Sequence, residues 1–107
     1  MAIYEKRTYD VIVGQMPEVI RLYAEEGWPA LASGGYSDNL VGYFTSDTGR
    51  LHQLVHMWKF DDDADRRAFW TRLFADEDFM KFAVQLRPHI GSQEIQLFNP
   101  APWGPQP

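Results

Sequence analysis

Residues 40–60 read LVGYFTSDTGRLHQLVHMWKF, and this stretch decides the fold. Two runs within it, residues 40–45 and 51–60, are rich in β-branched and aromatic side chains, which is typical of β-strands. Between them, residues 46–49 have the sequence SDTG, which favours a type I turn with glycine at its end. The stretch therefore predicts a β-hairpin.

The register of this hairpin follows from a four-residue turn. With residues 46–49 as the loop, Tyr43 pairs with His52 and Val41 pairs with Leu54. Side chains alternate between the two faces of a strand, so a slip of one residue would move all of them to the opposite face. The predicted pairing puts all four of these side chains on one face.

The segment before the hairpin is predicted to hold a strand and a helix. Residues 2–11 have β-branched and aromatic residues at short intervals, as a strand does. Apolar residues then recur at helical spacing from Met16 onward. The sequence Gly27-Trp28-Pro29 is expected to bend or break this helix, because the ring of Pro29 clashes with the preceding turn.

The segment after the hairpin repeats the pattern with a helical region and a strand. Acidic residues at 61–65 suit the positive end of a helix, and Asp76 is expected to cap a second helical segment that Arg87-Pro88 ends. Residues 91–98 alternate as a last strand. The order β-α-β-β-α-β predicts a ferredoxin-like α+β sandwich, with an antiparallel sheet and helices on one face.

Composition limits the class of protein. The chain has 107 residues, 45% of them hydrophobic, which fits one globular domain and excludes a disordered chain. A charge of −5 argues against a nucleic-acid binder, and zero cysteines exclude disulfides and thiolate zinc sites. The charged start and the absence of a long apolar run predict a cytoplasmic protein without a membrane span. We expect the domain to cover residues 1–99, followed by a Pro-rich arm at 100–107.

The strand at 51–60 is apolar on both faces, which predicts a homodimer. One face holds Leu51, Gln53, Val55 and Met57, and the other holds His52, Leu54, His56, Trp58 and Phe60. The aliphatic set is expected to pack against the helices, and the aromatic set is more apolar surface than a monomer usually exposes. A second copy packed sheet to sheet would cover it and form a barrel-like body; alternatively, the Pro-rich arm covers some of these aromatics.

Two residues are candidates for catalysis. His56 is predicted as an acid–base group, because imidazole transfers protons near neutral pH; the alternative is a hydrogen-bonded histidine without a catalytic role. Arg7 has planar donors suited to a carboxylate or enolate. The alternative for Arg7 is a pair with Glu5 or Glu94 that neutralises a buried charge.

The ligand is expected to meet further residues around this pair. They are Tyr9, Tyr43, His52, Trp58 and Glu94, with Trp58 and Tyr43 as apolar walls. His52 and His56 are about 13 Å apart on an extended strand, so they do not form a metal pair, and no metal site is predicted. No motif for a cofactor occurs, so none is expected.

The chain resembles the NIPSNAP family over residues 2–99. The resemblance is carried by Val41-Gly42-Tyr43-Phe44, Gly49-x-Leu51, Leu54-Val55-His56-Met57-Trp58-x-Phe60, Tyr4-Glu5-x-Arg7-Thr8-Tyr9, Asp65-Arg66 and Gln93-Glu94-x-x-Leu97. It implies a ferredoxin-like fold of the dimeric α+β barrel superfamily. His52 is a departure, since asparagine is frequent there in the family.

Related barrels include cofactor-independent monooxygenases, isomerases and haem-degrading enzymes, but fold analogy alone does not transfer an activity. Two hypotheses remain open. The first is a small dimeric barrel that binds a small apolar or aromatic, possibly anionic molecule, as a cofactor-independent monooxygenase or isomerase. The second is a ligand-binding or protein-assembly module without catalysis.

Overall fold

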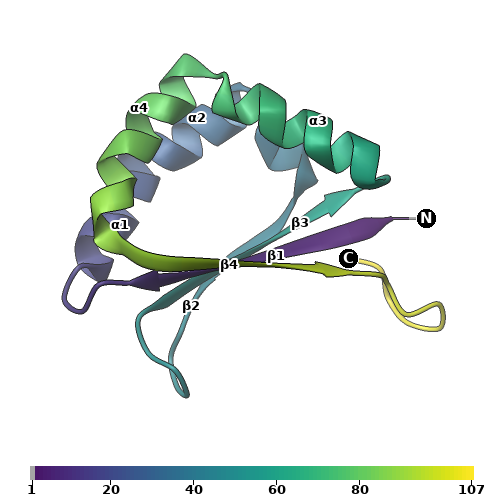
Figure 1. Ribbon diagram of the computed structural model, residues 1–107, viewed down its shortest axis with the longest axis horizontal. Helices are drawn as coiled ribbons and strands as arrows, with labels where there is room; N and C mark the ends of the chain where they lie inside the picture. The colour runs from purple at the N-terminus through teal and green to yellow at the C-terminus, as the bar shows by residue number, and fades with distance from the viewer. Residues whose placement is uncertain (1) are drawn as a thin grey trace.

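The computed structural model describes residues 2–107, and it confirms the predicted order of elements (Figure 1). The strands are β1 (Ile3–Val11), β2 (Leu40–Thr45), β3 (Gln53–Phe60) and β4 (Ile90–Phe98). The helices are α1 (Met16–Leu22), α2 (Trp28–Ser33), α3 (Asp63–Phe74) and α4 (Glu77–Leu86), with a π-helical turn at Tyr23–Gly27 and 3-10 turns at Tyr36–Asn39 and Arg87–His89.

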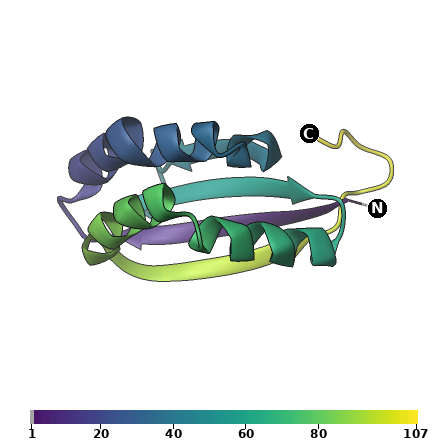
Figure 2. The same ribbon diagram turned by 90° about the horizontal axis from the view of Figure 1, so that it is seen from above.

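The four strands form one antiparallel sheet in the order β2-β3-β1-β4. The two helical segments lie side by side over one face of this sheet, α1 and α2 in one row and α3 and α4 in the other (Figures 1 and 2). The ferredoxin-like sandwich with helices on one face is therefore confirmed. In residues 2–107, no helix is long and apolar enough to cross a bilayer.

The predicted register of the hairpin is wrong by four residues. Tyr43 pairs with His56, not with His52, and β3 begins at Gln53, so the loop covers residues 46–52. The loop closes where the amide of Ser46 donates to the carbonyl of Gln53 at 3.0 Å. His52 has a left-handed backbone (φ 61°), which interrupts the extended conformation before β3 begins.

The predicted assignment of the two faces is also wrong. Leu54, His56, Trp58 and Phe60 are buried under the chain's own helices, while Val55 and Met57 lie on the opposite, half-buried face of the sheet. The helices are themselves aromatic, and Phe69 and Trp70 pack against the aromatic set. This set therefore does not need a second copy to be covered.

The first helical region continues through Gly27-Trp28-Pro29 as a wide turn. Proline has no amide hydrogen to donate, and here the chain forms a π-helical turn in which the amide of Trp28 donates to the carbonyl of Tyr23. A Cβ atom at Gly27 would lie 2.7 Å from the ring of Phe82, so only glycine allows α4 to approach this closely. The turn fixes Tyr23 at the start of the wide segment.

The predicted cap of α4 is confirmed, whereas the alternative in which the C-terminal arm covers the aromatic set is not. The side chain of Asp76 accepts a hydrogen bond from the amide of Phe79 at 3.0 Å, as expected for the cap of α4. The C-terminal arm folds back on the sheet, because the hydroxyl of Tyr4 donates to the carbonyl of Pro107 at 2.7 Å. The arm therefore covers Tyr4 on the face opposite the helices, rather than the aromatic set.

Candidate functional site

Buried polar side chains lie on the helix-facing side of the two central strands. Glu5 and Arg7 project from β1, and His56 projects from β3, where its backbone pairs with that of Arg7. All three are less than a tenth exposed. Buried charges are unfavourable unless they are paired, so their partners define what this site can do.

Glu5 holds the charged part of this site together. Its Oε2 atom accepts from Nε of Arg7 at 2.6 Å, and its Oε1 atom accepts from Nη1 of Arg66 at 2.7 Å and from Nε1 of Trp70 at 3.2 Å. The guanidinium of Arg7 also lies 3.8 Å from the centre of the Trp70 ring. Of the two partners considered for Arg7, the structure therefore shows Glu5; Glu94 pairs with Thr8 on the other face and is exposed.

His56 is a neutral histidine with one free donor. Its Nδ1 atom accepts a hydrogen bond from Nε1 of Trp58 at 2.7 Å, so the ring proton sits on Nε2. That Nε2 atom is buried and has no hydrogen-bond partner among residues 2–107. Burial, and secondarily the charge of Arg7, lower the pKa of His56 to about 3. The imidazole is therefore an uncharged N–H donor at neutral pH.

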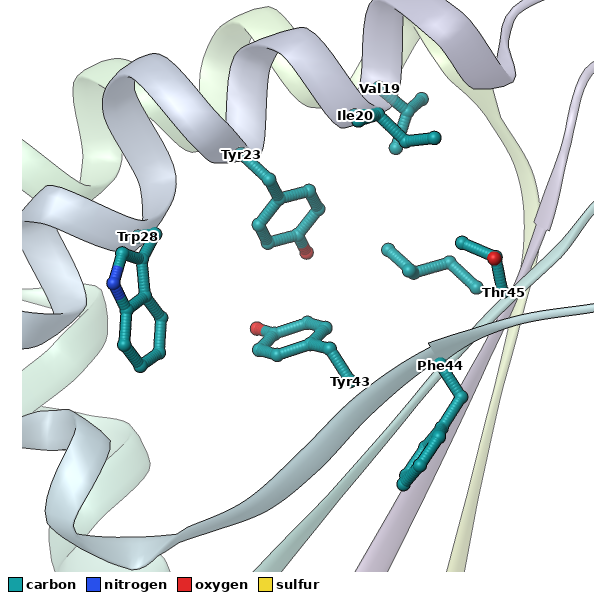
Figure 3. A pocket seen from close by; sticks show the side chains of 8 residues that line it. Val19, Ile20, Tyr23, Trp28, Tyr43, Phe44 and Thr45 are labelled. Carbon is teal, nitrogen blue, oxygen red and sulfur yellow. The ribbon is translucent and has the colours of Figure 1, made fainter.

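Aromatic rings enclose His56. The ring of Tyr43 stacks on it at 4.7 Å between centroids, and Tyr9 meets it edge-on at 4.8 Å. Burial raises the pKa of the Tyr43 and Tyr23 hydroxyls, which point toward one another (Figure 3). Both hydroxyls therefore stay protonated and can donate to a ligand.

An apolar cavity of about 290 Å³ opens next to these tyrosines, between α1 and the edge strand β2 (Figure 3). Its lining consists of Val19, Ile20, Tyr23, Trp28, Tyr43, Phe44, Thr45 and Leu54. Apolar cavities of this size with a few polar atoms are typical of small-molecule sites. Tyr23, Tyr43 and Thr45 contribute hydroxyl groups to this lining.

A second, smaller cavity of about 120 Å³ lies on the other side of Tyr23, under α4. Its lining consists of Arg7, Tyr9, Tyr23, Phe74, Phe79, Ala83, Leu86, Arg87, Ile90 and Gln93. Tyr23 borders both cavities.

The structure brings together five of the seven residues predicted for the site. Arg7, Tyr9, Tyr43, His56 and Trp58 share the helix-facing side of the sheet. His52 and Glu94 do not join them, because His52 lies before β3 and Glu94 is on the exposed face of β4.

Sequence reasoning missed three residues, Arg66, Trp70 and Tyr23. Tyr23 continues the helical spacing of apolar residues that begins at Met16, a pattern that is equally typical of a core residue. The roles of Arg66 and Trp70 depend on which face of β1 meets α3, and the sequence leaves that face open. Within the described residues, no three His, Asp or Glu side chains are grouped so as to hold a metal ion.

Comparison with known proteins places the chain in a family. The NIPSNAP family model matches residues 4–105. The chain belongs to the NIPSNAP family. Mouse protein NipSnap homolog 3B is 30% identical over 66 residues, which are 60% of this chain and 27% of the mouse protein. This NIPSNAP chain therefore matches about a quarter of the length of that relative.

Solved structures agree with the family and the fold. A NIPSNAP family protein from Agrobacterium tumefaciens is 33% identical, with a TM-score of 0.89 over 96% of this chain and 89% of the other. A protein from Chloroflexus aurantiacus described as a putative antibiotic biosynthesis monooxygenase has a TM-score of 0.62 at 12% identity and covers 98% of both chains. The second likeness shows the shared fold alone.

Proposed function

We propose that this NIPSNAP domain binds a small apolar or aromatic molecule in the cavity between α1 and β2. The observation that carries the proposal is the apolar cavity of about 290 Å³, whose inner wall has the hydroxyls of Tyr23 and Tyr43. Burial of an aromatic ligand there removes apolar surface from water, at about 25 cal/mol for each Å². The hydroxyls would orient a single carbonyl or hydroxyl of that ligand.

The proposed chemistry is that of a cofactor-independent monooxygenase or isomerase. Reactions of enolisable or phenolic substrates without a cofactor pass through an oxyanion, which N–H and O–H donors stabilise. The Tyr23 and Tyr43 side chains line the cavity, whereas His56 lies behind the Tyr43 ring. His56 supports such a role from there, because its buried Nε2–H has no partner among residues 2–107. We propose a donor role for His56 in place of proton transfer, since its lowered pKa makes it a weak base.

The neutral dye N-phenyl-1-naphthylamine tests binding in this cavity. Ile20→Trp places an indole at the mouth of the cavity, while Ile12→Trp adds the same bulk at a similarly exposed residue outside it. We expect Ile20→Trp to weaken binding of the dye by at least tenfold and Ile12→Trp by less than twofold, measured by fluorescence titration. Equal affinities for the two variants would show that the dye binds elsewhere.

The alternative function is ligand binding or protein assembly without catalysis. The same cavity would then hold a molecule that leaves unchanged. Mass spectrometry of small molecules retained by the purified protein, before and after incubation in air, separates the two. A retained molecule whose mass changes (oxygenation), or whose chromatographic retention time changes at constant mass (isomerisation), on incubation with the protein but not with His56→Gln supports the enzyme. A molecule unchanged in both mass and retention time supports the binding module.

We propose in addition that two copies pair through the sheet face opposite the helices. Val55, Met57 and Phe44 lie on that face between polar neighbours, and Phe44 is 58% exposed. Apolar side chains of this kind form the centre of homodimer interfaces. Sedimentation velocity at micromolar concentration is expected to show a species of twice 12.4 kDa; a monomer alone would exclude the pairing.

A further inference from the structure

The second cavity, under α4, is lined by two arginines. Arg7 comes from β1, and Arg87 comes from the turn that follows α4. In the part of the chain that the structure describes, the residues around this cavity include no Asp or Glu. A small cavity with two positive groups and no internal counter-charge is suited to an anion.

The Nε atom of the Arg7 guanidinium is hydrogen-bonded, and its two Nη atoms have no acceptor among residues 2–107. Its Nε atom donates to Glu5 at 2.6 Å, and its flat face rests 3.8 Å from the centre of the Trp70 ring. The Nη atoms lack an acceptor in this part of the chain although the Arg7 side chain is only 9% exposed, so that little of it can be hydrogen-bonded to bulk water instead. The rest of the fold thus holds the guanidinium in one orientation before any ligand binds.

Glu5 neutralises Arg7 only in part. Its second oxygen is shared with Arg66 and Trp70, so one carboxylate serves two guanidinium groups. Arg66 has a further ion-pair partner in Asp63, at 2.9 Å, whereas among residues 2–107 Arg7 pairs with Glu5 alone. The positive charge that remains on Arg7 borders the cavity.

The other polar groups of the cavity are donors as well. Tyr9, Tyr23 and Gln93, whose hydroxyl and amide groups can donate, also line it, and Arg87 is exposed with no ion pair to any residue from 2 to 107. Burial keeps the Tyr23 hydroxyl protonated. The apolar side chains of the lining, including Phe74 and Phe79, lower the local dielectric constant. This strengthens the attraction between the donors and an anion in the cavity.

We propose that this second cavity is a binding site for the carboxylate group of a small molecule, which the free Nη edge of Arg7 and the guanidinium of Arg87 hold. A carboxylate matches the planar pair of donors on a guanidinium, and a cavity of about 120 Å³ holds this group together with part of the small molecule that carries it. The inference deepens the proposed function and rests on it, since it names the anionic class of ligand. Tyr23, which borders both cavities, would then contact both the apolar part and the charged end of the ligand.

A matched pair of probes tests the site. 4-Fluorobenzoate and 4-fluorobenzamide have nearly the same shape and differ in charge, and ¹⁹F NMR at 0.15 M salt gives both dissociation constants. We expect benzoate to bind at least tenfold more tightly than benzamide, because a hydrogen bond to a charged group contributes more than one between neutral groups. Equal affinities, or tighter binding of inorganic phosphate than of benzoate, would overturn the proposal.

Two charge-removing variants locate the probe. Arg87→Gln removes an exposed cation of the cavity, and Arg67→Gln removes an exposed cation of α3 that does not line it. We expect Arg87→Gln to weaken benzoate binding about fivefold and benzamide binding less than twofold, and Arg67→Gln to change neither. An equal effect of the two variants on benzoate would mean that net charge alone attracts the probe, and would overturn the site.

The same samples separate this inference from the proposed function. Arg87→Gln should leave binding of N-phenyl-1-naphthylamine unchanged, because Arg87 does not border the apolar cavity. A benzoate preference without dye binding supports the carboxylate site and contradicts the proposed occupant of the apolar cavity. Dye binding without a benzoate preference supports the proposed occupant of the apolar cavity and contradicts the carboxylate site.

Discussion

Glu5→Gln is expected to lower the free energy of unfolding by about 3–5 kcal/mol, the usual cost of breaking a buried ion pair. The carboxylate of Glu5 is completely buried and receives donors from Arg7, Arg66 and Trp70. A neutral amide cannot balance the two guanidinium groups, and its NH₂ would face one of them. Arg7 would then be a buried charge without a counter-ion.

Urea unfolding at pH 7, followed by tryptophan fluorescence, measures this loss. Glu94→Gln is the matched control, since it makes the same chemical change at an exposed position on the opposite face. The control is expected to change stability by less than about 0.5 kcal/mol. A loss below about 1 kcal/mol for Glu5→Gln is typical of an exposed pair and would contradict the buried arrangement.

His56 is expected to make the protein less stable as the pH falls below about 6.5. In the folded protein the pKa of His56 is about 3, whereas an unfolded histidine titrates near 6.5. Between these values only the unfolded chain binds the proton, so lowering the pH favours unfolding. This stability is fully present above about 6.5, and about 2 kcal/mol of it is lost between pH 7.5 and 5.0.

The comparison with His56→Gln isolates this effect. The two proteins share every other titratable group, including Asp63 and Asp76, whose pKa values are lowered, so the difference between their pH dependences reports on His56. Urea unfolding of both proteins at pH 7.5, 6.0 and 5.0 should show a steeper fall for the wild type, by about 2 kcal/mol in total. Parallel pH dependence would mean that His56 is solvated and takes up a proton in the folded state.

The order of the elements and the caps could be predicted from the sequence because they depend on local chemistry. Alternation, turn residues and helix spacing extend over a few residues each, and the cap at Asp76 needs only the amide of Phe79 three residues away. The grouping of Tyr43 with His56 on one face also holds. This grouping is correct although the register is not, because a shift by an even number of residues, here four, leaves each side chain on the same face of the strand.

The choice of face could not be predicted, because it depends on contacts far apart in the sequence. Glu5 and Arg7 make one face of β1 look solvent-exposed, and only their pairing with Arg66 and Trp70 on α3 allows that face to be buried. The aliphatic pair Val55 and Met57 looks like a core face, although polar strand neighbours such as Lys6 and Thr8 surround it. A histidine with a left-handed backbone at residue 52, which lengthens the loop, gives no signal in the sequence either.

The central claim is that the ligand site lies between the sheet and the helices, not on the opposite face of the sheet. Methyl NMR of the protein titrated with N-phenyl-1-naphthylamine tests it most directly. The methyl groups of Val19, Ile20 and Leu54, which line the apolar cavity, should shift with a common dissociation constant. Those of Val55 and Met57, on the other face, should stay in place; shifts confined to Val55 and Met57 would contradict the claim.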